Sequence, residues 1–152
     1  MSPLVGKLET NVEINAPASK FHEIFKHRPH HVSNHASDFV QGCDLHEGEW
    51  GAVGSVICWK YFHDGKPKVA KELVEAIDDE NNIITFKVLE GDLMEHYKNF
   101  RITIKCIPKG DKESVIRCSV EYEKIHDEII DPHTLLVFFN DLSKDLEKHL
   151  AA

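Results

Sequence analysis

The feature that most constrains this chain is a series of short segments between residues 38 and 124 in which apolar and polar residues alternate. Turn-forming stretches separate these segments, among them Asp64-Gly65, residues 78–82 and residues 109–111. A period of two residues is typical of strands that bury one face. Strands joined by such short turns pair antiparallel, because parallel pairing needs a long crossover connection. This region is therefore predicted to form one antiparallel sheet.

The segment before residue 38 adds a strand and a short helical region. Residues 7–14 alternate as one more strand. Phe21, Ile24 and Phe25 then recur at helical spacing, and the proline at position 29 breaks that pattern. A second short helix is expected around residues 30–33. The sheet is thus predicted to contain seven strands, with two short helices after the first.

The last segment has the period of a single long helix. It follows Asp131-Pro132, which is typical of a helix start. Its apolar residues form one stripe: Leu135, Phe138, Phe139, Leu142, Leu146 and Leu150. The stripe needs a cover, and the sheet is the only large candidate. Residues 1–152 are therefore predicted to form one α+β domain in which a curved sheet grips a C-terminal helix.

Strand alternation also predicts which side chains face the interior. If the charged positions point to solvent, the inward set is mainly aliphatic, but it includes polar-tipped residues: Trp59, Tyr61, Glu72, His96 and Tyr122. A core rarely buries a carboxylate without a partner. An apolar cavity with a few converging polar groups is typical of a ligand site. Two interpretations stay open here: a cavity, or a solid core in which Glu72 forms an ion pair or is turned outward by a bulge.

Composition and charge exclude several classes of partner. The formal net charge is −8, from 18 basic and 26 acidic residues. Binding to nucleic acid or to anionic membranes is not expected, because both depend on clustered lysine and arginine. The first twenty residues lack a signal-like apolar core, and no apolar run is long enough to cross a membrane. A cytoplasmic protein without membrane insertion is expected.

Two motifs suggest known chemistry but lack essential parts. The loop Gly48–Gly54 has a glycine at every third position, but no Gly-Lys-Ser/Thr follows it and it does not open a helix. The histidines at positions 27, 30, 31 and 35 have no nearby cysteine or acid to complete a metal site. The four cysteines form no CxxC pair. We therefore expect no metal, no disulfide and no cofactor.

Several segments resemble the plant major latex proteins. Residues 41–56 (QGCDLHEGEWGAVGSV) look like their glycine-rich loop, residues 86–92 (FKVLEGD) like their fifth strand, and residues 119–124 (SVEYEK) like their seventh. The similarity runs from end to end. These proteins belong to the superfamily of the major birch pollen allergen and the pathogenesis-related class 10 proteins. The resemblance implies a plant source, the helix-grip (START-like) fold and a large internal cavity for sterols, lipids, terpenoids, alkaloids or flavonoids.

On that fold, the residues expected to contact a ligand come from the inner face of the sheet and from the helices. They are Phe25, His31, His35, Trp59, Tyr61, Glu72, Phe86, His96, Phe100, Tyr122, Phe138, Phe139 and Leu142. His31 and His35 are included because the short second helix meets the sheet near the cavity mouth in this fold.

The resemblance leaves three functions to weigh. The first is a carrier or buffer of a small hydrophobic molecule, acting as a monomer or weak dimer. The second is a cofactor-independent cyclase or isomerase, with Glu72, His96 and Tyr122 as candidates for proton transfer. Related alkaloid-condensing enzymes use a lysine, and here Lys98 has the right parity but lies near an expected strand distortion. The third function, a ribonuclease, is disfavoured by the acidic charge.

Overall fold

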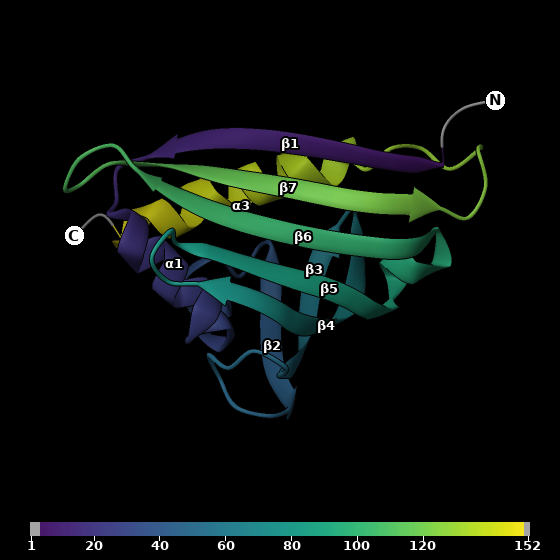
Figure 1. The fold of residues 1–152 in the computed structure, drawn as a ribbon, viewed down its shortest axis with the longest axis horizontal. Coiled ribbons are helices and arrows are strands. Elements are labelled where there is room, and N and C mark those ends of the chain that lie inside the picture. The colour runs from purple at the N-terminus through teal and green to yellow at the C-terminus, as the bar shows by residue number, and fades with distance from the viewer. Residues whose placement is uncertain (1–3, 151–152) are drawn as a thin grey trace.

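The computed structural model describes residues 4–150, and the predicted architecture is confirmed (Figure 1). One antiparallel sheet has the strand order β1-β7-β6-β5-β4-β3-β2. Its strands are β1 (Val5–Ile14), β2 (Val40–Glu47), β3 (Val56–His63), β4 (Lys66–Asp78), β5 (Ile83–Gly91), β6 (Tyr97–Pro108) and β7 (Ser114–Lys124). The helices are α1 (Ala18–Lys26), η1 (Pro29–His31), α2 (Val32–His35), η2 (Asp92–Glu95) and α3 (His133–Leu150).

The sheet curves around α3, which lies against its inner face (Figure 1). The predicted apolar stripe faces the sheet: Leu135, Phe139, Leu142 and Leu146 are buried. A side-chain hydrogen bond fixes the helix against the edge strand, because Asn140 donates to the Thr10 hydroxyl at 2.9 Å. Burial of the apolar stripe holds the helix against the sheet, and this hydrogen bond fixes the position of the helix along β1.

The short helices close one end of the curved sheet. Phe21, Ile24 and Phe25 of α1 are buried. The break at Pro29 is confirmed, since η1 begins there and α2 continues directly from it. The Lys26 ammonium binds the Asp79 carboxylate at 2.8 Å and so joins α1 to the β4–β5 turn.

Alternation along β6 is interrupted near its start. A register shift between Tyr97 and Asn99 inserts one extra residue relative to β7. The expectation that His96 faces the interior is therefore wrong: His96 is exposed, and Tyr97 is buried instead. The Tyr97 ring packs 5.0 Å from Phe100 and 5.6 Å from Tyr122, measured between ring centroids. A β-bulge has this effect because it moves every preceding side chain to the other face.

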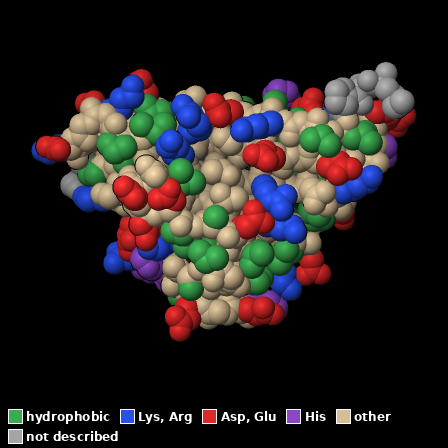
Figure 2. All heavy atoms as spheres, viewed as in Figure 1, with side chains coloured by type: hydrophobic (Ala, Val, Ile, Leu, Met, Phe, Trp, Pro, Cys, Tyr) green, Lys and Arg blue, Asp and Glu red, His purple; other side chains and the backbone are tan. Residues whose placement is uncertain are grey.

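The outer face of the sheet carries many charged side chains. In Figure 2, acidic and basic side chains are interspersed over the strands on the visible face. Some of them pair across strands, as Arg101 does with Glu75 at 2.9 Å. Such exposed pairs contribute little stability. On this face they leave no continuous basic surface of the kind that binds nucleic acid.

Candidate functional site

The interior of the sheet contains a cavity of about 90 Å³, here called the inner cavity. Strands β2 to β6 form its floor, and α1, η2 and α3 complete its walls. Its lining consists of Phe25, Val40, Trp59, Tyr61, Ala70, Glu72, Phe86, Leu93, Ile102, Ile104, Leu135, Phe138, Phe139 and Leu142. Strands β1 and β7 contribute no residue to this lining, so the cavity lies beneath the other five strands.

Eight of the predicted ligand contacts line the inner cavity. They are Phe25, Trp59, Tyr61, Glu72, Phe86, Phe138, Phe139 and Leu142. Sequence reasoning did not select the other six as contacts. Ala70, Ile102 and Ile104 have the inward parity of their strands, and Leu135 lies on the helix stripe. Val40 and Leu93 carried no sequence signal, because they stand at the start of a strand and in a short 3-10 helix.

Phe100 and Tyr122 face inward as expected but do not reach the inner cavity. Their rings stack on each other, with centroids 6.2 Å apart, and neither residue is part of the cavity lining. The Tyr122 hydroxyl donates a hydrogen bond to Asp131 Oδ1 at 2.6 Å. Both residues therefore stabilise the fold rather than line the cavity.

The histidines of the short helices also lie away from the inner cavity, contrary to the expectation for His31 and His35. His31 packs edge-on against His30, whose ring stacks on Trp50 of the glycine-rich loop at 4.2 Å. His35 stacks on His149 at the end of α3, also at 4.2 Å. The physical reason is geometric: α2 has only four residues, and its buried side chain is Val32. The histidines instead contact neighbouring segments, namely the glycine-rich loop and the end of α3.

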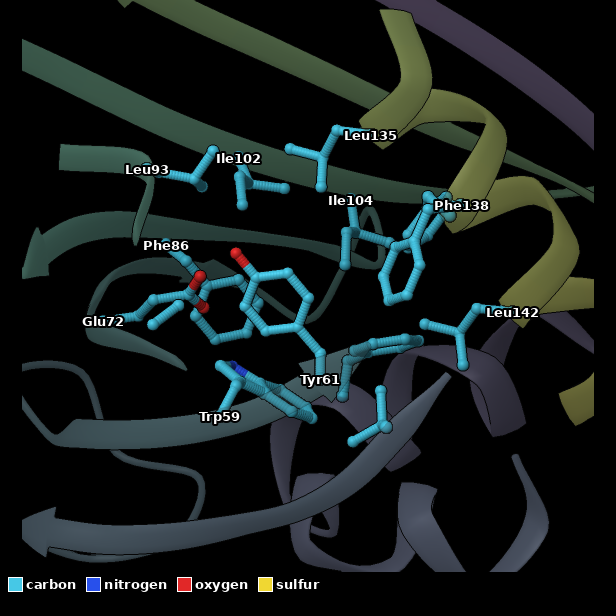
Figure 3. A pocket seen from close by; sticks show the side chains of 14 residues that line it. Trp59, Tyr61, Glu72, Phe86, Leu93, Ile102, Ile104, Leu135, Phe138 and Leu142 are labelled. Carbon is cyan, nitrogen blue, oxygen red and sulfur yellow. The ribbon is translucent and has the colours of Figure 1, made fainter. Parts of the chain in front are cut away.

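Two polar side chains meet within the apolar lining (Figure 3). Glu72 is 5% exposed and Tyr61 is 6% exposed. In Figure 3 the Glu72 carboxyl and the Tyr61 hydroxyl point into the same part of the cavity, with the Trp59 indole nitrogen beside the carboxyl. Burial raises the pKa of Glu72 to about 8, although the hydrogen bond from Trp59 opposes this shift. The carboxyl group is therefore mostly protonated near neutral pH.

The Tyr61 hydroxyl has no hydrogen-bond partner among residues 4–150. Burial, and then the nearby Glu72 carboxyl, raise the pKa of this phenol, so it keeps its proton. A buried hydroxyl without a partner costs roughly 1–3 kcal/mol. The site thus contains a hydrogen-bonding group whose partner the protein does not supply.

A wider opening adjoins the inner cavity, and we call it the vestibule. Its volume is about 510 Å³. Three residues, Tyr61, Leu93 and Leu135, line both spaces and so lie between them, and we call this place the constriction. The vestibule is acidic, because its lining has more carboxylates than ammonium groups. The carboxylates belong to Asp64, Asp92, Glu95, Glu128 and Asp131, and the ammonium groups belong to Lys66 and Lys68. His96 lines the vestibule, not the inner cavity.

His63 joins the rim of the vestibule to the first turn of α3. Its Nε2 lies 3.1 Å from the Thr134 hydroxyl, and the Lys68 ammonium lies 3.2 Å from its Nδ1. Its ring packs against Phe138, which lines the inner cavity. Burial and the adjacent Lys68 lower the pKa of His63. The rim is therefore held by a neutral imidazole.

A buried lysine fixes the segment that joins β7 to α3. The side chain of Lys124 is 7% exposed, and its ammonium lies 3.0 Å from Asp131 Oδ1, where the carboxylate is 43% exposed. The hydrogen bond from Tyr122, and then that from Lys124, hold the pKa of Asp131 below its usual value. This cluster positions one wall of the vestibule.

Replacing Asp131 by alanine is expected to lower the free energy of unfolding by about 2 kcal/mol, because it leaves the Lys124 ammonium buried without its counterion. Lys124→Met should cost less than about 1 kcal/mol, since water can reach the carboxylate that remains. Urea unfolding of both variants measures this asymmetry. The exposed pair Lys148–Asp145, 3.1 Å apart, is the control, and neither Lys148→Met nor Asp145→Ala should exceed about 0.5 kcal/mol. Equal losses at Asp131 and Lys124 would contradict the expected asymmetry.

Comparison with known proteins identifies the family. Residues 3–152 match the pathogenesis-related protein Bet v 1 family. The chain belongs to this family. It is 55% identical to MLP-like protein 43 of Arabidopsis thaliana, over 99% of this chain and 96% of that protein. It is 54% identical to MLP-like protein 28 of the same plant over 99% of this chain, which spans only 45% of that longer protein. The resemblance to major latex proteins is confirmed.

Solved structures agree with the fold. The ginseng major latex-like protein 151 from Panax ginseng superposes with a TM-score of 0.94 at 42% identity, over 98% of this chain and 99% of that one. A norcoclaurine synthase from Thalictrum flavum, solved with dopamine and hydroxybenzaldehyde, has a TM-score of 0.71 at 19% identity over 95% of this chain and 88% of that one. At that identity the second likeness concerns the fold alone.

Residues 4–150 show the features of neither a membrane span nor a metal site. No helix among them is both long enough and apolar enough to cross a bilayer. No group of three or more histidine, cysteine or acidic side chains within that range is arranged to hold a metal ion. The four cysteines are free thiols, and burial raises the pKa of the Cys106 and Cys118 thiols to about 12.

Proposed function

We propose that this protein binds a small hydrophobic molecule in the inner cavity and the vestibule and acts as its carrier or buffer. The observation that carries the proposal is an apolar cavity containing a buried hydroxyl that the protein leaves unpaired, that of Tyr61. Empty space of this kind costs stability, because the side chains around it lose packing contacts. Membership of the Bet v 1 family supports the same function.

The dimensions favour a ligand that spans both spaces. The inner cavity, at about 90 Å³, is smaller than the roughly 300–1,000 Å³ of ordinary ligand pockets, whereas the vestibule, at about 510 Å³, falls within that range. A slim apolar part would pass the constriction at Tyr61, Leu93 and Leu135 and pack against Phe86 and Phe139. The bulkier part would remain in the vestibule.

A cavity-filling variant tests this proposal. Ala70→Leu places a larger side chain in the inner cavity and is expected to weaken binding of the neutral fluorescent probe phenylnaphthylamine by about tenfold or more. Ala76→Leu is the matched control, because it makes the same change at an exposed position of the same strand. The probe is titrated by fluorescence, with circular dichroism to verify folding. Failure of the wild-type protein to bind the probe, or equal binding by both variants, would overturn the proposal.

A second candidate function is a cyclase or isomerase. Its support is Glu72, whose pKa of about 8 suits a general acid or base and which shares the cavity with the Tyr61 hydroxyl. The norcoclaurine synthase fold shows that this architecture can support an enzyme. Of the other two candidates, His96 lines the vestibule and Tyr122 is bonded to Asp131, so neither shares the inner cavity with Glu72. Glu72→Gln should then change the products formed from a reactive enol or dialdehyde, whereas Tyr122→Phe, which removes a hydroxyl bonded to Asp131, should not.

A further inference from the structure

We propose that the ligand is uncharged and presents a hydroxyl or carbonyl oxygen to Tyr61 and Glu72, and that anionic amphiphiles are excluded. This inference rests on the proposed function and specifies the chemistry of the same site. It begins from the composition of the inner cavity, where Trp59, Tyr61 and Glu72 are the lining residues with polar tips. The remaining lining is hydrocarbon, so only a ligand group placed near these three can form hydrogen bonds.

The hydrogen-bonding capacity of the three side chains defines the complementary group. The Trp59 indole N–H is engaged with the Glu72 carboxyl. A protonated carboxyl donates one further hydrogen bond, and a phenol both donates and accepts. Two donors that converge on one place suit an oxygen with two lone pairs. A ketone accepts from both, and an alcohol can in addition donate to the Tyr61 oxygen.

A ligand carboxylate does not fit this place. It would bring a negative charge into an apolar space beside a second carboxyl group, with no cation lining the inner cavity. Charge burial without a counterion is strongly unfavourable. A ligand carboxylate could enter only as the neutral acid.

The vestibule disfavours anions as well. Of its five carboxylates, that of Asp131 is paired with Lys124, which leaves four against two lysines. Lys68 is itself hydrogen-bonded to His63. An amphiphile with an anionic head would therefore meet excess negative charge at the mouth if its tail entered first. If its head entered first, it would meet Glu72. The overall charge of −8 acts in the same direction.

Displacement of phenylnaphthylamine by four ligands that share an eight-carbon skeleton tests this inference. The ligands are n-octanol, methyl hexyl ketone, octanoate and octylamine. We expect the alcohol and the ketone to compete about tenfold better than octanoate and octylamine at neutral pH. The acidic vestibule would attract the ammonium group of octylamine, but the inner cavity, where Glu72 is mostly protonated, offers neither ion a charged partner. Tighter binding of octanoate or octylamine would overturn the inference while leaving the proposed function intact. Failure of the probe itself to bind would overturn both.

Two variants identify the hydrogen-bonding groups. Tyr61→Phe should lower the affinity for the ketone about tenfold more than it lowers the affinity for the probe. Tyr122→Phe is the control, since it removes a phenol that faces Asp131 and should leave the ratio of the two affinities unchanged. Glu72→Gln keeps a donor at the site, so its ketone affinity should not vary from about pH 6 to about pH 9, whereas that of the wild type should fall above about pH 8. Equal ratios in Tyr61→Phe and Tyr122→Phe would contradict the assignment.

Discussion

Replacing Glu72 by glutamine is expected to raise the free energy of unfolding by about 3 kcal/mol at about pH 7. The folded protein holds the proton of this buried carboxyl up to a pKa of about 8, against an ordinary value of 4.5. The unfolded chain releases that proton above about pH 4.5, and between the two values each pH unit lowers the stability of the folded state by about 1.4 kcal/mol. Glutamine has no proton to lose and keeps the acceptor for Trp59.

The sign and the pH range make this prediction specific. The difference between Glu72→Gln and the wild type should be small near pH 4.5, grow as the pH rises, and level off above about pH 8. Urea unfolding at a series of pH values measures it. Glu80→Gln, at an exposed position of the β4–β5 turn, is the control and should show no such trend. A constant difference from about pH 5 to about pH 8 would mean that the Glu72 carboxyl is ionised in the folded protein.

A carboxyl that destabilises its own fold indicates selection for something other than stability. Position 72 lies in the inner cavity, where an aliphatic side chain would pack without a desolvation cost. Proteins commonly accept such costs at sites that bind or react. The same reasoning applies to the unpaired hydroxyl of Tyr61, and the two residues lie in one place. Their proximity is the main support for a ligand-binding site here.

Most of the fold could be predicted from sequence because its periods are regular. The stripe that includes Leu142 and Leu146 could only bury itself against the sheet, and both residues are buried there. In β3 and β4 the alternation around Trp59, Tyr61 and Glu72 is unbroken, so the inward face followed directly. The spacing of apolar residues, and hence the face that an element buries, is a local property that one sequence is enough to reveal.

The wrong predictions about site residues arose where tertiary contacts override the local sequence pattern. His96 was misplaced because the bulge after Tyr97 reverses the parity of the residues before it. A strand distortion near Lys98 was expected and is confirmed, but its effect on the side chains before it was not taken into account. His31 and His35 lie too far from the cavity because α2 is a single turn. The constriction at Leu93 depends on how η2 folds over the sheet. These features are set by contacts between distant segments.

The constriction itself depends on Gly91, and Gly91→Ala is expected to lower the free energy of unfolding by about 3 kcal/mol. Gly91 has φ +122°, a conformation that L-residues rarely adopt. A Cβ atom there would overlap the Val69 carbonyl oxygen. Val69 cannot move aside freely, because it pairs with Lys60 in β3 and its N–H donates to Asp92 Oδ2 at 2.8 Å. Backbone strain and the loss of this bond account for the estimate.

Substitutions at two other glycines separate the cost of backbone strain from the cost of the overlap with Val69. Gly110 also has a positive φ, but a Cβ atom there would lie in open space. Gly110→Ala should therefore lower the free energy of unfolding by about 1 kcal/mol through backbone strain alone. Gly42 has neither a positive φ nor an atom close to the added Cβ, so Gly42→Ala should change the free energy of unfolding by less than about 0.5 kcal/mol. Because η2 begins directly after Gly91 and carries Leu93, Gly91→Ala should also weaken phenylnaphthylamine binding, which the two controls should not. If Gly91→Ala were no more costly than Gly110→Ala, the close approach of β5 to β4 would not determine the position of η2, and the constriction would need another cause.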